Sequence, residues 1–285
     1  MTGIPFAKGH GTENDFVVLP DPDGELELTA ARVAALCDRR RGLGADGVLR
    51  VVRWTALKDD AFPAQPGVEW FMDYRNADGG VAEMCGNGVR VYARWLADAG
   101  WLPEGPAAPL RLGTRAGVRE VRFTGSDPAN DIAVDMGAVR IGPTSTATVG
   151  GCTFAGTAVD VGNPHLACVT DAPLDALDLT AQPGFDAALF PHGVNVEFLT
   201  PMVKDRIAMR VHERGVGETR SCGTGTVAAA VAALRAAGAT TGDVAVRTPG
   251  GRLRVVVAEG TTVLQGPAML VASGELDQAW WAGLA

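Results

Sequence analysis

The sequence has few aromatic residues, no long apolar segment and no excess of basic charge. Phe, Trp and Tyr make up 6% of its 285 residues, whereas Gly (37) and Pro (17) are frequent, as in proteins rich in short strands and tight turns. No apolar run reaches the ~18 residues of a membrane span, and the first residues lack the core of a signal peptide. We therefore expect a cytoplasmic protein with no membrane partner. A formal net charge of −8 argues against a nucleic-acid partner, because phosphate binding needs a basic face.

The cysteines and histidines argue against three further classes. The five cysteines, at positions 37, 85, 152, 168 and 222, are odd in number and widely spaced, unlike a disulfide framework. A dithiol oxidoreductase would be expected to have a C-x-x-C motif, which is absent. The four histidines are scattered, so we expect no metal site.

Short apolar segments between turn-forming residues predict a mostly antiparallel sheet with strands of about 4–7 residues. The first of these segments is 15–20 and the last is 262–265. Residues 29–40, 87–99 and 224–237 have helical patterns. The third helix has one charge, Arg235, which predicts that it is buried. The basic cluster Arg39-Arg40-Arg41 is expected to cap the end of the first helix. The predicted fold class is α+β.

The second and third helices begin in the same way. Residues 84–90 read Met-Cys-Gly-Asn-Gly-Val-Arg and residues 221–227 read Ser-Cys-Gly-Thr-Gly-Thr-Val, with the cysteines 137 positions apart (222 − 85). This spacing, about half the chain, predicts a duplication into domains 1–128 and 129–273, separated in the polar loop 125–130. The tail 274–285 contains Trp280 and Trp281, which are too apolar to stay exposed, so we expect it to pack on the first domain.

The matched turns suit proton transfer at an amino-acid α-carbon. Two bases on opposite faces of that carbon can invert it without a cofactor, one starting deprotonated and the other protonated. A helix N-terminus lowers a thiol pKa from about 8.5 toward neutrality, and Cys85 and Cys222 both occupy that place. The first-turn N–H groups attract a carboxylate, and Gly86 and Gly223 allow close approach of a small substrate.

Other interpretations of these residues remain. A single cysteine before a helix is usually packing, and Cys37, Cys152 and Cys168 have the apolar surroundings of core residues. Residues 223–228 also fit the dinucleotide fingerprint G-x-G-x-x-A. That signal is weak, because a loop rather than a strand precedes it.

The segments 8–16, 40–47, 74–79, 84–90, 161–165, 193–197 and 213–225 form an ordered set of motifs, of which the last is the most specific. In this order they resemble the diaminopimelate epimerase family nearly from end to end. The resemblance implies two pseudo-symmetric domains, each a curved, mostly antiparallel sheet around a central helix, with the active site in the cleft between them. It implies interconversion of LL- and meso-diaminopimelate for lysine and peptidoglycan precursors, without pyridoxal phosphate or metal, by a homodimer.

The resemblance also implies residue roles. Cys85 and Cys222 match the base–acid pair, whose roles depend on the configuration of the substrate, and His165 and Glu213 match residues near the reacting amine that assist thiol ionisation. Arg can grip a carboxylate with two parallel bonds, and Asn offers a donor and an acceptor without charge. Backbone N–H groups of Gly86, Asn87, Gly223 and Thr224 match the α-carboxylate site, and Asn14, Asn76, Asn163, Asn195 and Arg214 match substrate-recognising positions.

Two positions depart from the family pattern, and two rival functions remain. Glu13 stands where many members have Gly, and Gly47 stands where some have a Gln that reaches toward the site. A proline or hydroxyproline racemase of the same fold is the nearest alternative, but its substrate has no second zwitterion for Arg214 to bind. A non-catalytic amino-acid-binding protein would be expected to lose one of the two cysteines.

Because both thiols must approach one carbon, we predict that oxidation joins Cys85 to Cys222 and abolishes activity. Mass spectrometry of peptides from oxidised enzyme tests this. Inactive oxidised enzyme without that cross-link would contradict it.

Overall fold

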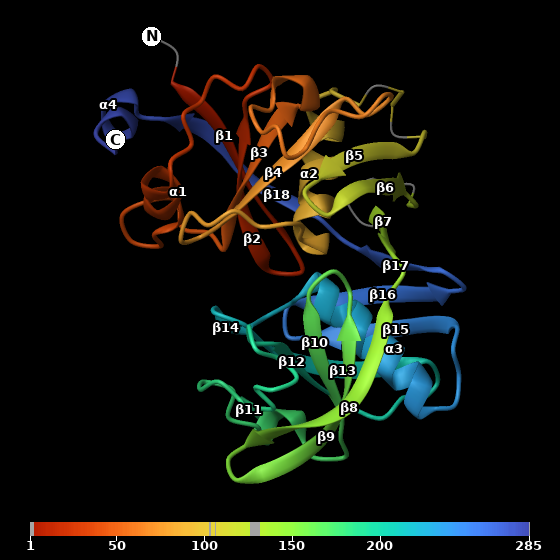
Figure 1. Cartoon of the computed structure of the whole chain (residues 1–285). Coiled ribbons are helices and arrows are strands. Elements are labelled where there is room, and N and C mark those ends of the chain that lie inside the picture. The colour runs from red at the N-terminus through yellow and green to blue at the C-terminus, as the bar shows by residue number, and fades with distance from the viewer. Residues whose placement is uncertain (1–2, 103, 106, 126–131, 285) are drawn as a thin grey trace. The chain divides into compact units, whose positions relative to one another are not determined.

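The computed structural model describes residues 3–102, 104–105, 107–125 and 132–284. The chain divides into two compact units (Figure 1). Unit 1 comprises Met1–Val134 and Pro267–Ala285, and unit 2 comprises Asp135–Gly266. Most of the predicted boundary loop, 125–130, lies outside the described residues. The α+β class is confirmed, since strands form most of the regular structure and helices are few in the described residues. None of these helices is long and apolar enough to cross a membrane.

Unit 1 contains a mixed sheet in the order β18-β1-β2-β3-β4-β5-β6. Neighbouring strands are antiparallel except for the parallel pairs β2–β3 and β4–β5. The strand bounds are β1 (Ile4–Gly11), β2 (Asn14–Pro20), β3 (Gly47–Arg53), β4 (Trp70–Asn76), β5 (Leu110–Thr114), β6 (Gly117–Phe123) and β18 (Met269–Leu276). The helical segments are α1 (Ala30–Cys37), the 3₁₀ turn η1 (Trp54–Ala56), α2 (Gly86–Asp98) and α4 (Gln278–Ala282).

Helix α2 is the central element of unit 1. It packs against β1, β2, β3, β4 and β18, so strands from both ends of the chain cover it. Tyr92, fully buried near its middle, donates a hydrogen bond from its hydroxyl to the Phe71 carbonyl at 3.0 Å. A polar group at this depth needs such a partner, because an unpaired buried hydroxyl costs free energy.

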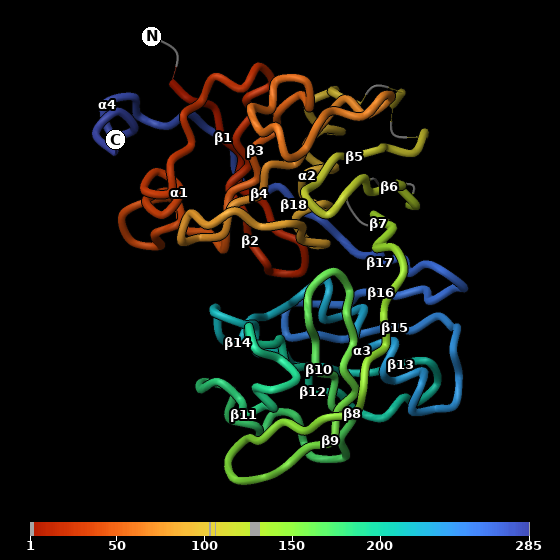
Figure 2. The backbone as a smooth tube through the Cα atoms, in the orientation of Figure 1, coloured from red at the N-terminus to blue at the C-terminus, as the bar shows by residue number. Residues whose placement is uncertain are grey.

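The C-terminal segment belongs to unit 1. Strand β18 pairs antiparallel with β1, so the last strand (blue) lies beside the first (red) in Figure 2. Trp281 of α4 is buried in a cluster with Val33 and Leu36 of α1, and the Arg32 guanidinium lies 5.0 Å from its ring centroid. An aromatic anchor of this size buries enough apolar surface to hold a short helix in place.

Helix α1 is shorter than the sequence predicts. Thr29 is the expected N-cap, and its hydroxyl accepts from Arg32 N–H at 3.2 Å. The helix ends at Cys37, however, and its last turn has no basic residue. Arg39 instead lies 2.8 Å from carboxylate oxygens of both Asp15 and Asp46. The prediction that the Arg39-Arg40-Arg41 cluster caps this helix is therefore wrong.

Unit 2 contains a second mixed sheet in the order β16-β15-β13-β12-β10-β9-β8-β11, with β17 beside β16. The pairs β10–β12 and β13–β15 are parallel, and the others are antiparallel. Strand β14 extends a hairpin from β13. The bounds are β8 (Arg140–Val149), β9 (Cys152–Asp160), β10 (Pro164–Val169), η2 (Leu174–Ala176), β11 (Gly184–Phe185), β12 (Asn195–Leu199), β13 (Arg206–Glu213), β14 (Gly217–Thr219), α3 (Gly223–Ala236), β15 (Gly242–Thr248), β16 (Gly251–Ala258) and β17 (Thr261–Gly266). Strand β7 (Ile132–Gly137) begins in unit 1, where it pairs antiparallel with β6, and ends in unit 2.

Helix α3 holds the same place in unit 2 as α2 in unit 1, and both helices end alike. It packs against β9, β10, β12, β13, β15, β16 and β17. Each helix is followed by a glycine in the left-handed region, Gly100 with φ 70° and Gly238 with φ 79°. The next N–H bonds back to a helical carbonyl, Trp101 to Leu96 and Ala239 to Leu234, which is the Schellman arrangement. The two halves therefore repeat a helix with the same start and the same end.

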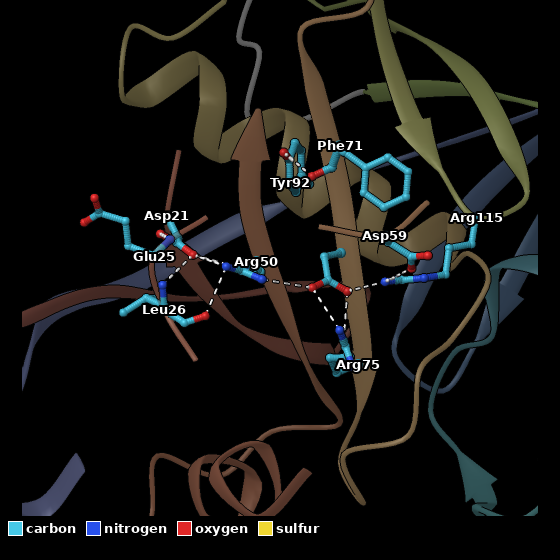
Figure 3. Close-up of polar contacts among 10 residues, drawn as sticks. Asp21, Glu25, Leu26, Arg50, Asp59, Phe71, Arg75, Tyr92 and Arg115 are labelled. Atoms are coloured by element: carbon cyan, nitrogen blue, oxygen red, sulfur yellow. Dashed lines mark hydrogen bonds and ion pairs between the residues drawn. The ribbon is translucent and has the colours of Figure 1, made fainter. Parts of the chain in front are cut away.

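A buried ionic network ties the strands of unit 1 together (Figure 3). The fully buried Asp73 carboxylate of β4 lies 2.8 Å from the guanidinium groups of both Arg75 and Arg115. Arg50 of β3 lies 3.6 Å from Asp73 and also pairs with the buried Asp21. Burial alone raises the pKa of Asp73, but the hydrogen bonds and charges of Arg75 and Arg115 outweigh it and lower the pKa. Asp73 is therefore ionised in the folded protein.

We predict that Asp73→Asn destabilises unit 1 by about 3–5 kcal/mol, because it leaves buried guanidinium groups without their carboxylate. Tryptophan fluorescence during urea titration reports unit 1 alone, since all six Trp residues lie within it. The folded pKa is below the ordinary value of 3.8, so the carboxylate stabilises at neutral pH and loses this effect as pH falls through the folded pKa. The difference in the free energy of unfolding between wild type and Asp73→Asn should therefore narrow below about pH 4.

Asp23→Asn is the matched control. Asp23 pairs with Arg53 at 2.7 Å, but both side chains are largely exposed. A surface pair of this kind contributes about 0–1 kcal/mol. Equal losses in the two variants would show that the Asp73 network does not hold unit 1 together.

Candidate active site

In unit 1, Cys85 is the N-cap of α2. Its backbone is extended, with φ −139° and ψ 118°, and its sulfur accepts from Gly88 N–H at 3.5 Å. The helix starts at Gly86, so Gly86 and Asn87 lie in the first turn, where a helix provides no backbone acceptors for the N–H groups. Cys85 is half-buried, whereas Gly86 and Asn87 are buried. The predicted start of a buried helix at this cysteine is correct.

Asn14 connects this thiol to a carboxylate. Its side-chain oxygen accepts from the Cys85 thiol at 3.5 Å and from Asn87 Nδ2 at 3.2 Å, while its own Nδ2 donates to Asp46 at 2.7 Å. Asp46 in turn pairs with Arg39. The structure therefore brings together Asn14, Cys85, Gly86 and Asn87, which are distant in sequence.

Asn76 lies at the end of β4 and forms a turn. Its N–H donates to Gly80 O and its carbonyl accepts from Gly79 N–H, both at 2.9 Å, and the residue is exposed. The backbone of Asn76 is therefore that of a turn, as expected for Asn before Ala-Asp-Gly. No contact of its side chain with the Cys85 group is seen among the described residues.

The two departures from the family pattern have local structural consequences. Glu13 has φ 63° and Thr12 has φ 51°, so they form the two-residue turn between β1 and β2 in the left-handed region. Such turns favour Gly, Asn or Asp, and Glu is strained there. A Cβ on Gly47 would lie 2.5 Å from Arg75 O, so this backbone has no room for a side chain at position 47.

In unit 2, Cys222 is the N-cap of α3 and repeats the geometry of Cys85. Its sulfur accepts from Gly225 N–H at 3.4 Å and lies 3.5 Å from the Thr224 hydroxyl. Gly223 and Thr224 form the buried first turn. Burial raises the pKa of the Cys222 thiol well above its ordinary value, and the carboxylates of Glu213 and Glu197 raise it further, against the hydrogen bonds from Thr224 and Gly225. The expectation that a helix N-terminus lowers a thiol pKa therefore does not hold at Cys222.

His165 is held from both sides in unit 2. Its Nδ1 lies 2.6 Å from Glu197 Oε1, and its Nε2 lies 2.9 Å from Asn163 Oδ1. His165 and Glu197 are both fully buried. Burial raises the pKa of Glu197, and the partner histidine partly opposes this. Such a pair fixes the orientation of the imidazole ring.

Glu197 belongs to a matching segment, but the sequence argument gives it no role. Its spacing from Asn195 could have indicated that it belongs to the site. It is two residues after Asn195 in a strand that is otherwise apolar, and alternate residues of a strand lie on one face. Strands β10 and β12 are parallel, with His165 opposite Asn195, which puts the Glu197 side chain on the face of His165.

The remaining predicted residues surround the β13–β14 hairpin. Glu213 at the end of β13 accepts a hydrogen bond from the Thr219 hydroxyl. Arg214 is exposed, and its backbone N–H donates to Asn195 Oδ1 at 2.8 Å while its guanidinium donates to His192 O at 3.1 Å. Asn195 is buried and sets the backbone position of Arg214. Unit 2 thus gathers a buried thiol, two carboxylates and a histidine, with an exposed guanidinium nearby in sequence.

Known proteins resemble the chain along its whole length. The family model described as "Diaminopimelate epimerase" matches residues 6–142 and 157–271. A diaminopimelate epimerase from Rhodococcus jostii (strain RHA1) is 59% identical, covering 99% of this chain and 100% of the relative. One from Mycolicibacterium smegmatis is 58% identical, covering 98% and 99%.

Solved structures share the fold at low identity. A phenazine biosynthesis protein of the PhzF family from Bacillus anthracis matches with TM-score 0.73 and 15% identity, covering 97% of this chain and 100% of that one. A hydroxyproline epimerase from Agrobacterium vitis matches with TM-score 0.71 and 14% identity, covering 99% and 96%. These likenesses concern the fold, whereas the family follows from the family model and the relatives of high identity. The chain belongs to the diaminopimelate epimerase family.

Proposed function

We propose that this chain interconverts LL- and meso-diaminopimelate by transferring an α-proton between Cys85 and Cys222, without metal or pyridoxal phosphate. Membership of an epimerase family makes the chain an isomerase. The observation on which the mechanism rests is the repeated turn: each unit has a cysteine as the N-cap of its buried central helix. This reaction would serve lysine and peptidoglycan precursor biosynthesis.

In the proposed reaction one cysteine acts as a thiolate and takes the α-proton, while the other donates its proton to the opposite face. Carbon inverts, and the charge passes from the first sulfur to the second. Backbone N–H groups of Gly86, Asn87, Gly223 and Thr224 would bind the α-carboxylate and stabilise the enolate-like charge of the transition state. Their position in the first turn of each helix supports this role.

His165 and Glu213 are proposed to lie beside the reacting amine and assist thiol ionisation. The contacts of His165 with Glu197 and Asn163 support a fixed orientation for its ring. The Glu213 carboxylate raises the pKa of the Cys222 thiol, which supports a place near this sulfur. A carboxylate there suits an ammonium group of the substrate.

Substrate recognition is proposed for Asn14, Asn76, Asn163, Asn195 and Arg214. The exposed guanidinium of Arg214 suits the carboxylate of the unreacting end, which it can grip with two parallel bonds. The bond from Asn195 to the Arg214 backbone supports a positioning role for that asparagine. Asn14 contacts the Cys85 thiol, which supports a place nearer the reacting end.

The same fold occurs in a hydroxyproline epimerase, so the fold alone does not distinguish the substrates. Proline has a single zwitterionic end, which leaves Arg214 without a ligand. Identity of 58–59% to diaminopimelate epimerases over nearly the full chain favours the acyclic, two-ended substrate.

We predict that the reduced protein exchanges the α-proton of LL-diaminopimelate in deuterated water and forms meso product, as followed by proton NMR. Cys85→Ala and Cys222→Ala should each reduce exchange by about 10³-fold or more, because each removes one of two obligatory proton-transfer groups. Cys152 is exposed, so the prediction that it is a core residue is wrong. Cys152→Ala is therefore the matched control and should retain full activity.

Proline replaces diaminopimelate in a parallel sample. Exchange of proline without exchange of diaminopimelate would keep the two-thiol mechanism and overturn the substrate. No exchange of either would favour the non-catalytic reading.

We also propose that the chain works as a homodimer in the cytoplasm. In unit 1, β18 pairs with β1 among the described residues, and it exposes Met269 and Val271. An exposed apolar strand at a sheet edge is a ready surface for a second copy.

Val271→Glu should therefore shift the protein from dimer to monomer in sedimentation velocity, because it buries a charge in the proposed interface. Val203→Glu, at an equally exposed valine of unit 2, is the control and should leave the dimer intact. A monomeric wild type, or a dimeric Val271→Glu variant, would contradict this interface.

A further inference from the structure

The two Cys-Gly-x-Gly turns share a backbone geometry but differ in the charges beneath them. Arg90 follows Cys85 by five residues on α2, and the corresponding residue after Cys222 on α3 is Val227. Both side chains are fully buried. Unit 1 therefore buries a cation where unit 2 buries a hydrocarbon.

The Arg90 guanidinium is held by uncharged acceptors. It donates to Gly86 O at 3.5 Å, to the Thr12 hydroxyl at 3.3 Å and to Pro267 O at 3.2 Å. Burial lowers the pKa of Arg90 to about 10, and the one charge that opposes this among the described residues is that of Cys85. A buried cation without a counter-ion is costly, so a thiolate on the adjacent turn lowers the free energy of this arrangement. The bond to Gly86 O places Arg90 under the turn that Cys85 caps.

Cys222 has carboxylates in place of a guanidinium. A Cβ built on Gly225 would lie 2.6 Å from Glu197 Oε1 and 3.3 Å from the Cys222 sulfur, so carboxylate and sulfur flank one point. Glu213 is the second carboxylate that acts on this thiol. Carboxylates close to a sulfur disfavour its ionised thiolate form.

Other charged groups near the two thiols are already paired. On the Cys85 side, Asn14 Oδ1 accepts from the Cys85 thiol at 3.5 Å, a long contact that favours the protonated sulfur and that the charge of Arg90 must outweigh. The Asn14 amide donates to Asp46, whose charge is offset by Arg39 at 2.8 Å. Lys8 and Asp15 pair with each other in the same group. On the Cys222 side, His165 is the nearby base, and it is bonded to Glu197. Arg90 thus acts on Cys85 in unit 1, whereas the carboxylates of Glu197 and Glu213 act on Cys222 in unit 2.

We infer that Arg90 and Glu197 set the resting protonation of the enzyme, so that the free protein holds its thiolate at Cys85 and its thiol proton at Cys222. Both are positioning residues, because they act on substrate only through the cysteines. The inference rests on the proposed function for its catalytic meaning but not for its measurement.

The asymmetry has a consequence for turnover. When the α-proton of the substrate faces Cys85, the base is already a thiolate. The α-proton passes to the Cys85 sulfur, and the thiol proton of Cys222 passes to the opposite face of the carbon. The product then leaves a thiolate at Cys222 beside two carboxylates. Loss of the Cys85 proton to water and uptake of a proton by Cys222 restores the resting state, so this return is downhill.

The test is the pH dependence of iodoacetamide alkylation of each cysteine in the free, reduced protein, resolved by peptide mass spectrometry. Only thiolate reacts, so the pH midpoint of each curve reports ionisation, while burial affects the plateau. Cys85 should have its midpoint at least about two pH units below that of Cys222. Exposed Cys152 provides an internal reference for the alkylation conditions.

The variants separate the two residues. Arg90→Met should raise the Cys85 midpoint by about one unit or more, a tenfold change in ionised fraction, and leave Cys222 unchanged. Glu197→Gln should lower the Cys222 midpoint and leave Cys85 unchanged. Arg90→Lys keeps the charge and should retain the wild-type Cys85 midpoint, which provides a folded comparison if Arg90→Met does not fold. Arg94→Met, which removes a partly exposed arginine of α2 paired with Asp98, should move neither midpoint.

The inference would be overturned if the two cysteines had the same midpoint, or if Cys222 had the lower one. It would also be overturned if Arg90→Lys and Arg94→Met raised the Cys85 midpoint as much as Arg90→Met does. No substrate is used, so the outcome is independent of the epimerase assay. Ordered midpoints without α-proton exchange would refute the proposed function alone. Full exchange with coincident midpoints would refute this inference alone.

Discussion

In each unit the cysteine turn depends on a helix that starts inside the protein. A helix start leaves N–H groups without backbone acceptors, and burying them costs free energy unless another group accepts. In each unit the N-cap sulfur accepts the N–H of the third residue, Gly88 or Gly225. The close packing of that turn explains its glycines: a Cβ on Gly88 would lie 3.2 Å from a Leu49 methyl, and one on Gly225 only 2.6 Å from Glu197. A turn closed to side chains but rich in N–H groups is suited to a small carboxylate.

The sequence predicts well those elements whose burial is strongly patterned. Helices α2 and α3 each begin one residue before the predicted start, because the Cys-Gly turn and the glycine after the helix mark both ends. Helix α1 ends three residues early, because its basic residues pair with Asp15, Asp38 and Asp46 rather than with helical carbonyls. Strands β8 and β18 escape prediction because nearly all their side chains are exposed, so neither shows the alternation of a half-buried strand. The pairing of β18 with β1 joins opposite ends of the chain, which no local pattern shows.

Residue identities in the site could be predicted from motifs, but the charges around the thiols could not. The motif holds Cys85, Asn87 and Arg90 in one helix, yet only the packed structure shows that Arg90 is buried without a carboxylate partner among the described residues. Glu197 becomes a neighbour of His165 through the parallel register of β10 and β12, which pairs segments about thirty positions apart (197 − 165 = 32). The charges around the thiols thus depend on the pairing of strands distant in sequence, whereas a motif describes only residues close in sequence.

Two thiols in matched turns pose an electrostatic problem that these charges resolve. Two identical thiols in identical turns would titrate together, and a state with one thiolate would be divided equally between them. Proton transfer across a carbon needs the opposite, one sulfur charged and the other protonated. Binding of the substrate carboxylate makes the same demand on both turns, and the matched backbone N–H groups meet it. Unmatched residues meet the asymmetric one: Arg90 stabilises charge at one sulfur, and Glu197 with Glu213 disfavours it at the other. The halves can therefore diverge in side chains while their helix starts stay alike, because geometry is shared by both steps of the reaction and charge is not.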